Sequence, residues 1–189
     1  MRVLGISGSL RRGSFNAALL RVAAERLPAG AELALFDRLR EVPPYDEDVD
    51  VAREPAAVHE LREAVREADA VLIATPEYNS SIPGQLKNAL DWVSRPAGRS
   101  ALRGKPVAVI GASTGMFGAV WAQAELRKVL AAMGGRVIEA ELPIAHANEL
   151  LRGDRLELPP QQAEQLEEIL AELVAAAETE AEATAPIAA

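Results

Sequence analysis

Residues 2–16 read RVLGISGSLRRGSFN and pass from an apolar run through a polar loop into a helical pattern. The run at 2–6 predicts a buried strand, and amphipathic helical spacing begins after Asn16. The loop between them is rich in serine and glycine, but it lacks the Gly-Lys-Ser/Thr of a P-loop and the GxGxxG dinucleotide fingerprint. Strand, loop and helix in this order are typical of the first unit of an α/β fold.

The same alternation recurs to the end of the chain, which predicts an α/β protein with a parallel sheet covered by helices on both faces. We expect strands at 2–6, 31–36, 70–74, 106–110 and 136–142. We expect helices over about 17–27, 58–68, 83–93, 118–133 and 159–176, with a loop at 37–52. The strand order 2-1-3-4-5 follows as the expectation for a five-stranded sheet in one domain over 1–176, and 177–189 are expected to form a disordered tail.

Composition excludes several classes of function. The 189 residues are 49% apolar and carry 28 acidic and 20 basic side chains, for a net charge of −8. This charge argues against nucleic acid as a partner, because phosphate binding needs a basic patch. The absence of cysteine excludes disulfides, thiolate metal sites and cysteine nucleophiles. With two histidines, no run of about 20 apolar residues and no signal peptide, we expect a cytoplasmic protein without a metal site or membrane span.

Three loops carry the unusual residues, and they follow the first, third and fourth predicted strands. In a sheet of this order those strand ends are neighbours, and ligands of such sheets bind there. The first loop offers short polar side chains and an arginine before a helix N-terminus, which suits a phosphate. The second, 75–84, is stiffened by prolines and suits the edge of a flat ring. The third, 111–118, contains three glycines that permit close approach of a ligand.

Together, a phosphate site and a ring site predict a phosphorylated flat cofactor, and a mononucleotide flavin fits both. Ordinary turns and a helix cap are the plainer interpretation of each loop. Asp37, at the end of the second strand, has the place of a ribose-binding residue in dinucleotide folds. Without the glycine fingerprint we interpret it as a surface turn residue.

At these loops the sequence resembles the NADPH-dependent FMN reductase family of the flavodoxin-like fold, which includes quinone, azo and chromate reductases. The matching blocks are Gly5-Ile6-Ser7-Gly8-Ser9-Leu10-Arg11 with Ser14 and Asn16, Thr75-Pro76-Glu77-Tyr78-Asn79, Ser81-Ile82-Pro83-Gly84, and Gly111-Ala112-Ser113 with Gly115 and Gly118. The likeness covers about residues 2–145.

The resemblance implies a cofactor-binding residue set and no catalytic acid or base. In the first loop, the FMN phosphate would be held by Ser9, Arg11, Ser14 and Asn16, with Phe15 among them. The isoalloxazine and ribityl portion would be lined by Pro76, Glu77, Tyr78 and Asn79, and the other edge of the ring would be closed by Ser113 and Gly115. NADPH or NADH would reduce the flavin, and a small-molecule acceptor such as a quinone would reoxidise it. A homodimer or tetramer is implied as well.

The chain departs from the family at one position of note. Many relatives have Gly-x-Arg-Ala-Gln after the glycine that corresponds to Gly118, whereas Trp121 replaces that arginine here. Subunit contacts of the arginine are therefore in question.

From sequence, two other functions remain open. One is a flavodoxin-type electron carrier or flavin redox sensor, and the other is a nucleotide-binding module without redox chemistry. The physiological acceptor and the choice between NADH and NADPH stay unassigned.

Overall fold

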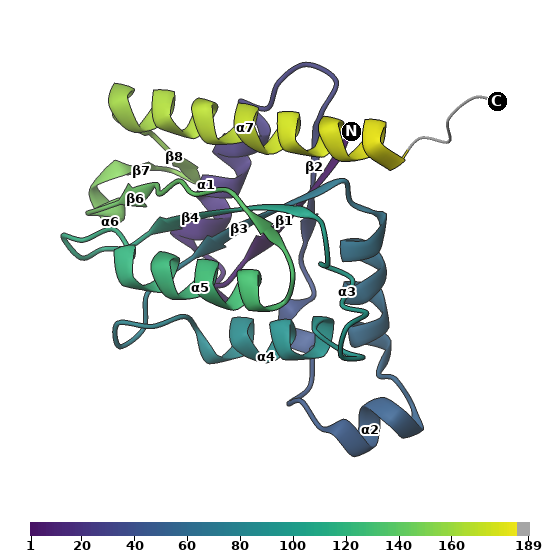
Figure 1. The fold of residues 1–189 in the computed structure, drawn as a ribbon. Helices are drawn as coiled ribbons and strands as arrows, with labels where there is room; N and C mark the ends of the chain where they lie inside the picture. Colours follow the sequence, from purple (N-terminus) through teal and green to yellow (C-terminus); the bar gives the residue numbers. More distant parts are fainter. Residues whose placement is uncertain (185–189) are drawn as a thin grey trace.

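The structure, a computed structural model, describes residues 1–184 and has the predicted α/β class (Figure 1). Its main sheet is parallel and has the predicted order β2-β1-β3-β4-β5, with β6 also paired to β4. The strands are β1 (Arg2–Ser7), β2 (Glu32–Phe36), β3 (Ala70–Thr75), β4 (Pro106–Ala112), β5 (Arg136–Val137) and β6 (Pro143–Ile144). Every residue of β3 and β4 is buried, as their apolar runs predict for central parallel strands.

Helices cover both faces of this sheet and make three layers (Figure 1). One face carries α1 (Phe15–Ala24) and α7 (Pro160–Thr184), and the other carries α3 (Ala56–Glu67), α4 (Gly84–Val93) and α5 (Val120–Ala132). Two separate apolar cores result, one on each side of the sheet, and Trp92 on α4 is fully buried in one of them. Within residues 1–184, no helix has the length and apolar character needed to cross a membrane.

The fifth sheet position differs from the continuous strand predicted at 136–142. In this segment only β5 and β6 are strands paired with β4. Ile138 N still donates to Val107 O at 2.8 Å and Leu142 O accepts from Gly111 N at 3.1 Å, but residues 139–141 leave the ladder. Side chains of α5 form hydrogen bonds with that backbone: Leu142 N donates to Oε1 of Gln123 at 3.1 Å, and Arg127 donates to Ala140 O at 3.4 Å. These side-chain bonds replace strand pairing, and strand propensity alone does not reveal them.

Two further segments differ from expectation. The predicted loop at 37–52 contains a short 3₁₀ turn, η1 (Leu39–Glu41), and α2 (Glu47–Ala52), which begins where the side chain of Asp46 accepts from Asp48 N at 2.9 Å. At the other end, α7 continues to Thr184, past the predicted domain end at 176, and buries Ala177. Residues 185–189 of the predicted tail lie outside the described residues. The remaining elements are α6 (Ala147–Leu150), β7 (Leu151–Arg152) and β8 (Arg155–Leu156).

Candidate functional site

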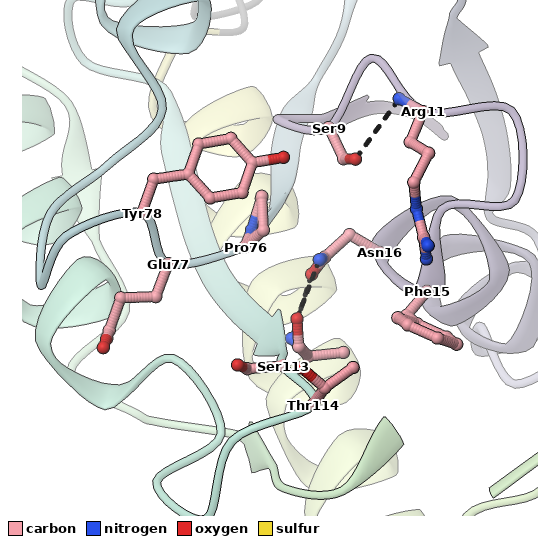
Figure 2. A pocket seen from close by; sticks show the side chains of 10 residues that line it. Ser9, Arg11, Phe15, Asn16, Pro76, Glu77, Tyr78, Ser113 and Thr114 are labelled. Atoms are coloured by element: carbon pink, nitrogen blue, oxygen red, sulfur yellow. Dashed lines mark hydrogen bonds between the residues drawn. The ribbon is translucent and has the colours of Figure 1, made fainter. Parts of the chain in front are cut away.

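The three predicted loops meet at one cavity of about 280 Å³, at the carboxyl ends of β1, β3 and β4 (Figure 2). The first loop contributes Ser9 and Arg11, together with Phe15 and Asn16 from the start of α1. The second contributes Pro76, Glu77 and Tyr78, and the third contributes Ala112, Ser113 and Thr114. The convergence predicted from strand order is therefore confirmed.

The first loop passes directly into the N-terminus of α1. Ser14 is the N-cap, and its buried hydroxyl accepts from Ala17 N at 3.1 Å. Phe15 and Asn16 line the cavity, and as first-turn residues their main-chain N–H groups have no partner within the helix. Arg11 stands beside them, with its guanidinium 4.8 Å from the centre of the Phe15 ring and Nη2 donating to Gly13 O at 2.8 Å. Helix dipole and guanidinium together favour an anion at this end of the cavity.

A close approach joins the first loop to the second. Gly8 N donates to Ala74 O at 2.8 Å. A Cβ on Gly8 would lie 2.9 Å from Leu86 Cδ2 and 3.3 Å from Pro76 Cδ. Glycine suits this close approach, because a Cβ there would displace the Leu86 side chain and press against Pro76.

Asn16 joins the first loop to the third. Its side chain is buried, and its amide makes two hydrogen bonds of 2.9 Å with the main chain of Ala112, Nδ2 to the carbonyl and Oδ1 from the N–H. The side chain therefore fixes the start of α1 to the end of β4. The Asn16 amide is therefore engaged by Ala112 and is not one of the polar side chains that the first loop offers to the cavity.

The second loop ends in a tight turn behind Tyr78. Tyr78 N donates to Ser81 O at 3.0 Å and Ser81 N to Tyr78 O at 3.1 Å. Asn79 and Ser80, between them, have φ of 53° and 60°, the left-handed values of a type I′ turn. Tyr78 remains 51% exposed at the edge of the cavity, and Figure 2 shows the hydroxyl end of its ring directed toward the first loop.

Glu77 has a partner that the sequence does not reveal. Its Oε2 accepts from the main-chain N–H groups of Trp121 and Ala122, both at 3.1 Å, in the first turn of α5. That helix has Ala119 at its N-cap position, in the left-handed conformation and without a side-chain cap of its own. Glu77 therefore caps α5 from the second loop, and Figure 2 shows its carboxylate turned away from the first-loop residues.

The third loop is held from both sides. Ser113 Oγ accepts from Gly115 N at 3.1 Å, while Ser113 N donates to Ile144 O at 2.9 Å. Gln123, fully buried, donates from Nε2 to Gly118 O at 3.1 Å. His146, which follows β6, donates its main-chain N–H to Gly115 O at 3.2 Å.

Most residues predicted for the site line the cavity: Ser9, Arg11, Phe15, Asn16, Pro76, Glu77, Tyr78 and Ser113. Among the described residues, Ser14, Asn79 and Gly115 do not line it, and they shape the helix cap, the turn and the third loop instead. Ala112 and Thr114 line it and were not predicted, although their position beside Ser113 at the end of an apolar run was available as a signal. Within residues 1–184, no cluster of three or more potential His, Asp or Glu metal ligands is present.

The chain is similar in sequence to proteins of a known family. The sequence model described as NADPH-dependent FMN reductase matches residues 1–149. An NAD(P)H-dependent FMN reductase of Pseudomonas aeruginosa is 51% identical over 130 residues, covering 69% of both chains. A quinone reductase of Escherichia coli K12 is 41% identical over 139 residues, covering 73% of both chains.

Solved structures give the same picture. FerB, a flavoenzyme NAD(P)H:(acceptor) oxidoreductase of Paracoccus denitrificans, superposes with a TM-score of 0.82 at 35% identity, over 94% of this chain and 97% of that one. A flavodoxin of Pseudomonas aeruginosa superposes with a TM-score of 0.58 at 21% identity, over 94% and 99% of the two chains. The latter likeness shows the fold alone, and it confirms the predicted flavodoxin-like architecture.

Proposed function

The chain belongs to the NADPH-dependent FMN reductase family, and from this premise we propose that its three-loop cavity holds FMN and that the protein is an NAD(P)H-dependent oxidoreductase acting on quinones or similar acceptors. When bound, FMN supplies the redox chemistry, accepting a hydride from NADPH or NADH and passing electrons to the acceptor. The protein supplies position and electrostatics.

Convergence of the three motif-bearing loops on one cavity is the observation that carries this proposal. The cavity offers an anion site at one end, formed by Ser9, Arg11 and the first N–H groups of α1. At the other end Pro76, Tyr78 and Ser113 offer a stiff, partly apolar boundary for a flat ring. The phosphate and ring of a flavin mononucleotide fit these two ends.

The remaining predicted residues support the site indirectly. Ser14 caps α1, Asn16 fixes α1 to β4, and Glu77 caps α5. Asn79 and Gly115 belong to the turns that present Tyr78 and Ser113. In this proposal no side chain acts as a general acid or base.

An absorbance spectrum of the purified protein, followed by NADPH addition without oxygen, tests the proposal. We expect a flavin spectrum that bleaches within the mixing time and recovers when a benzoquinone is added. A protein that neither contains flavin nor takes up added FMN would contradict the proposal. Bound flavin that stays oxidised with both NADPH and NADH would favour an electron carrier or redox sensor.

For the assembly, we propose a homodimer or tetramer. Met116 and Phe117 in the third loop and Trp121 just after it are 66%, 54% and 48% exposed, and the two aromatic rings lie edge to face with centroids 4.7 Å apart. Clustered exposed apolar side chains favour association. Light scattering after size exclusion is expected to give the mass of two or four chains, and the double variant Phe117→Glu with Trp121→Glu is expected to give monomers. A monomeric wild-type protein would contradict this assembly.

We propose that the protein is located in the cytoplasm. A reductase that depends on NAD(P)H needs a compartment in which the dinucleotide is kept reduced, and a chain without cysteine gains nothing from an oxidising one. Fractionation of cells with an antibody to the protein tests this, and recovery outside the cytoplasmic fraction would contradict it.

A further inference from the structure

A second cavity, of about 340 Å³, lies on the other side of the first loop, between α1, the end of β2 and η1. It shares Ser9 and Arg11 with the first cavity, so the two are adjacent and separated only by that loop. Its volume lies in the range of small-molecule sites. Its lining from the first loop belongs to the family motif, whereas its lining from α1, from β2 and from the residues between β2 and Arg40 belongs to neither the motif nor the proposed flavin site.

One wall of the second cavity is apolar. Ala17 and Leu20 of α1 and Leu35 of β2 form it, and Leu35 is 46% exposed although it lies in a strand of the sheet. Leu35 is opposite Gly5 on β1, where a Cβ would lie only 2.9 Å from Leu35 Cδ2. The missing Cβ lets the leucine lie flat against the sheet, and the exposed wall that results suits a flat heterocyclic base.

The opposite rim is basic. Arg11, Arg12 and Arg40 line the cavity, and among the described residues none of the three forms an ion pair with a carboxylate. Arg40 donates instead to Leu10 O, which orients it toward the first loop, whereas Arg38 in the same turn is bound by Glu41 and Glu60. Three guanidinium groups against one carboxylate, that of Asp37, leave the cavity net positive, which attracts phosphate even in a chain of net charge −8.

Asp37 also lines this cavity. A carboxylate repels phosphate, but it is a good acceptor for the hydroxyl groups of a sugar. A base wall, a carboxylate and a group of arginines therefore correspond to the base, sugar and phosphates of a nucleotide.

We propose that the second cavity binds the adenosine phosphate half of the NAD(P)H reductant, with adenine on the Leu35 wall, a ribose hydroxyl at Asp37 and phosphates at Arg12 and Arg40. This inference rests on the proposed function, because it assigns a place to the reductant of that same reaction. The second cavity adjoins the first at Ser9 and Arg11, so the adenosine half lies beside the phosphate end of the flavin site, and the nicotinamide half extends along the bound flavin toward its ring.

Steady-state kinetics with three reductants test the proposal: NADPH, NADH and reduced nicotinamide mononucleotide, which lacks the adenosine half. In the FMN-loaded protein, Arg12→Gln and Leu35→Asp are each expected to raise the KM for both dinucleotides about tenfold. Arg12→Gln removes one charge-assisted hydrogen bond to a phosphate, and Leu35→Asp removes the apolar wall under the adenine. The KM for reduced nicotinamide mononucleotide and the kcat at saturation are expected to stay at wild-type values. The matched control is Arg99→Gln, an exposed arginine after α4, which is expected to change neither KM.

Calorimetric titration of the FMN-free protein with ADP supplies a readout other than activity. We expect wild type and Arg99→Gln to bind ADP, and Arg12→Gln and Leu35→Asp to bind it about tenfold more weakly. Dinucleotide KM values that do not change in either variant, or a mononucleotide KM that rises equally, would overturn the inference while leaving the reductase activity in place. A wild-type protein that neither dinucleotide reduces would instead overturn the proposed function.

Discussion

The side-chain amide of Asn16 and the main chain of Ala112 form a reciprocal pair of hydrogen bonds, both 2.9 Å long, across 96 positions of sequence. Asn16 lies at the start of α1, where the anion end of the cavity is, and Ala112 is the last residue of β4, where the ring end begins. This one amide therefore sets the separation between the two ends of the proposed flavin site.

Substitution of Asn16 is expected to weaken both the fold and the site. Asn16→Ala leaves Ala112 N–H and C=O buried without these partners, at a cost of about 1–3 kcal/mol for each group left unsatisfied. We expect a lower free energy of unfolding in urea for the FMN-free protein and a higher Kd for FMN by fluorescence quenching. Asn148→Ala, at an exposed position of α6, is the control. An unchanged FMN affinity in a destabilised Asn16 variant would contradict the role in setting the separation.

Removal of the Glu77 carboxylate is expected to loosen the start of α5. Glu77→Ala removes the cap of two main-chain N–H groups and is expected to cost about 0.5–2 kcal/mol, while Glu77→Gln keeps an acceptor oxygen and is expected to cost less. Urea unfolding measures both. Glu125→Ala, exposed on the same helix, controls for the loss of an acidic side chain. Equal losses for the alanine variants at 77 and 125 would argue against the cap.

Ser80 provides a test of the type I′ turn. A non-glycine residue at φ 60° is strained, so Ser80→Gly is expected to raise the free energy of unfolding by up to about 1 kcal/mol. Ser80→Ala keeps the strain and is expected to behave like wild type. If the alanine variant gains as much as the glycine variant, backbone strain is not the cause.

Acid is expected to weaken the contact between Glu54, just after α2, and Arg62 of α3. Arg62, 8% exposed, donates to Glu54 Oε1 at 2.6 Å, to Asp50 Oδ1 at 2.8 Å and to Trp92 O at 2.7 Å. Burial raises the pKa of Glu54, but hydrogen bonds from Arg62 and His59 outweigh it, and the net effect is a pKa below the ordinary 4.5. The folded protein therefore takes up this proton later than the unfolded chain, so the contribution is complete above pH 4.5 and is lost as the pH falls through the lowered pKa.

Urea unfolding between pH 3 and pH 7 measures this loss, with the pH range chosen to bracket an ordinary glutamate. Glu54→Gln is expected to show a smaller decrease in stability with acid than wild type. Glu168→Gln, exposed on α7, is the matched control and is expected to decrease like wild type. Identical decreases in all three proteins would show that Glu54 does not contribute.

Both the correct and the missed predictions have physical causes. Buried strands such as β3 and β4 are visible as continuous apolar runs. The partners of Asn16 and Glu77 lie 96 and 44 residues away, and no local pattern encodes them. The end of α7 was missed for another reason: its alanine and glutamate residues are strong helix formers, but their low complexity suggested a tail.

The hydrogen bond between Glu77 and residue 121 uses only the main-chain N–H of residue 121. The cap at the start of α5 therefore tolerates any non-proline residue there, and the exchange of the arginine of many relatives for Trp121 leaves this bond intact. A change of side chain at 121 therefore leaves the hydrogen bonds around the cavity in place. The same holds at two other positions, because Asn16 binds the main chain of Ala112 and Gln123 binds the main chain of Leu142. Members of such a family can diverge in surface chemistry beside the pocket, residue by residue, without a compensating change inside it.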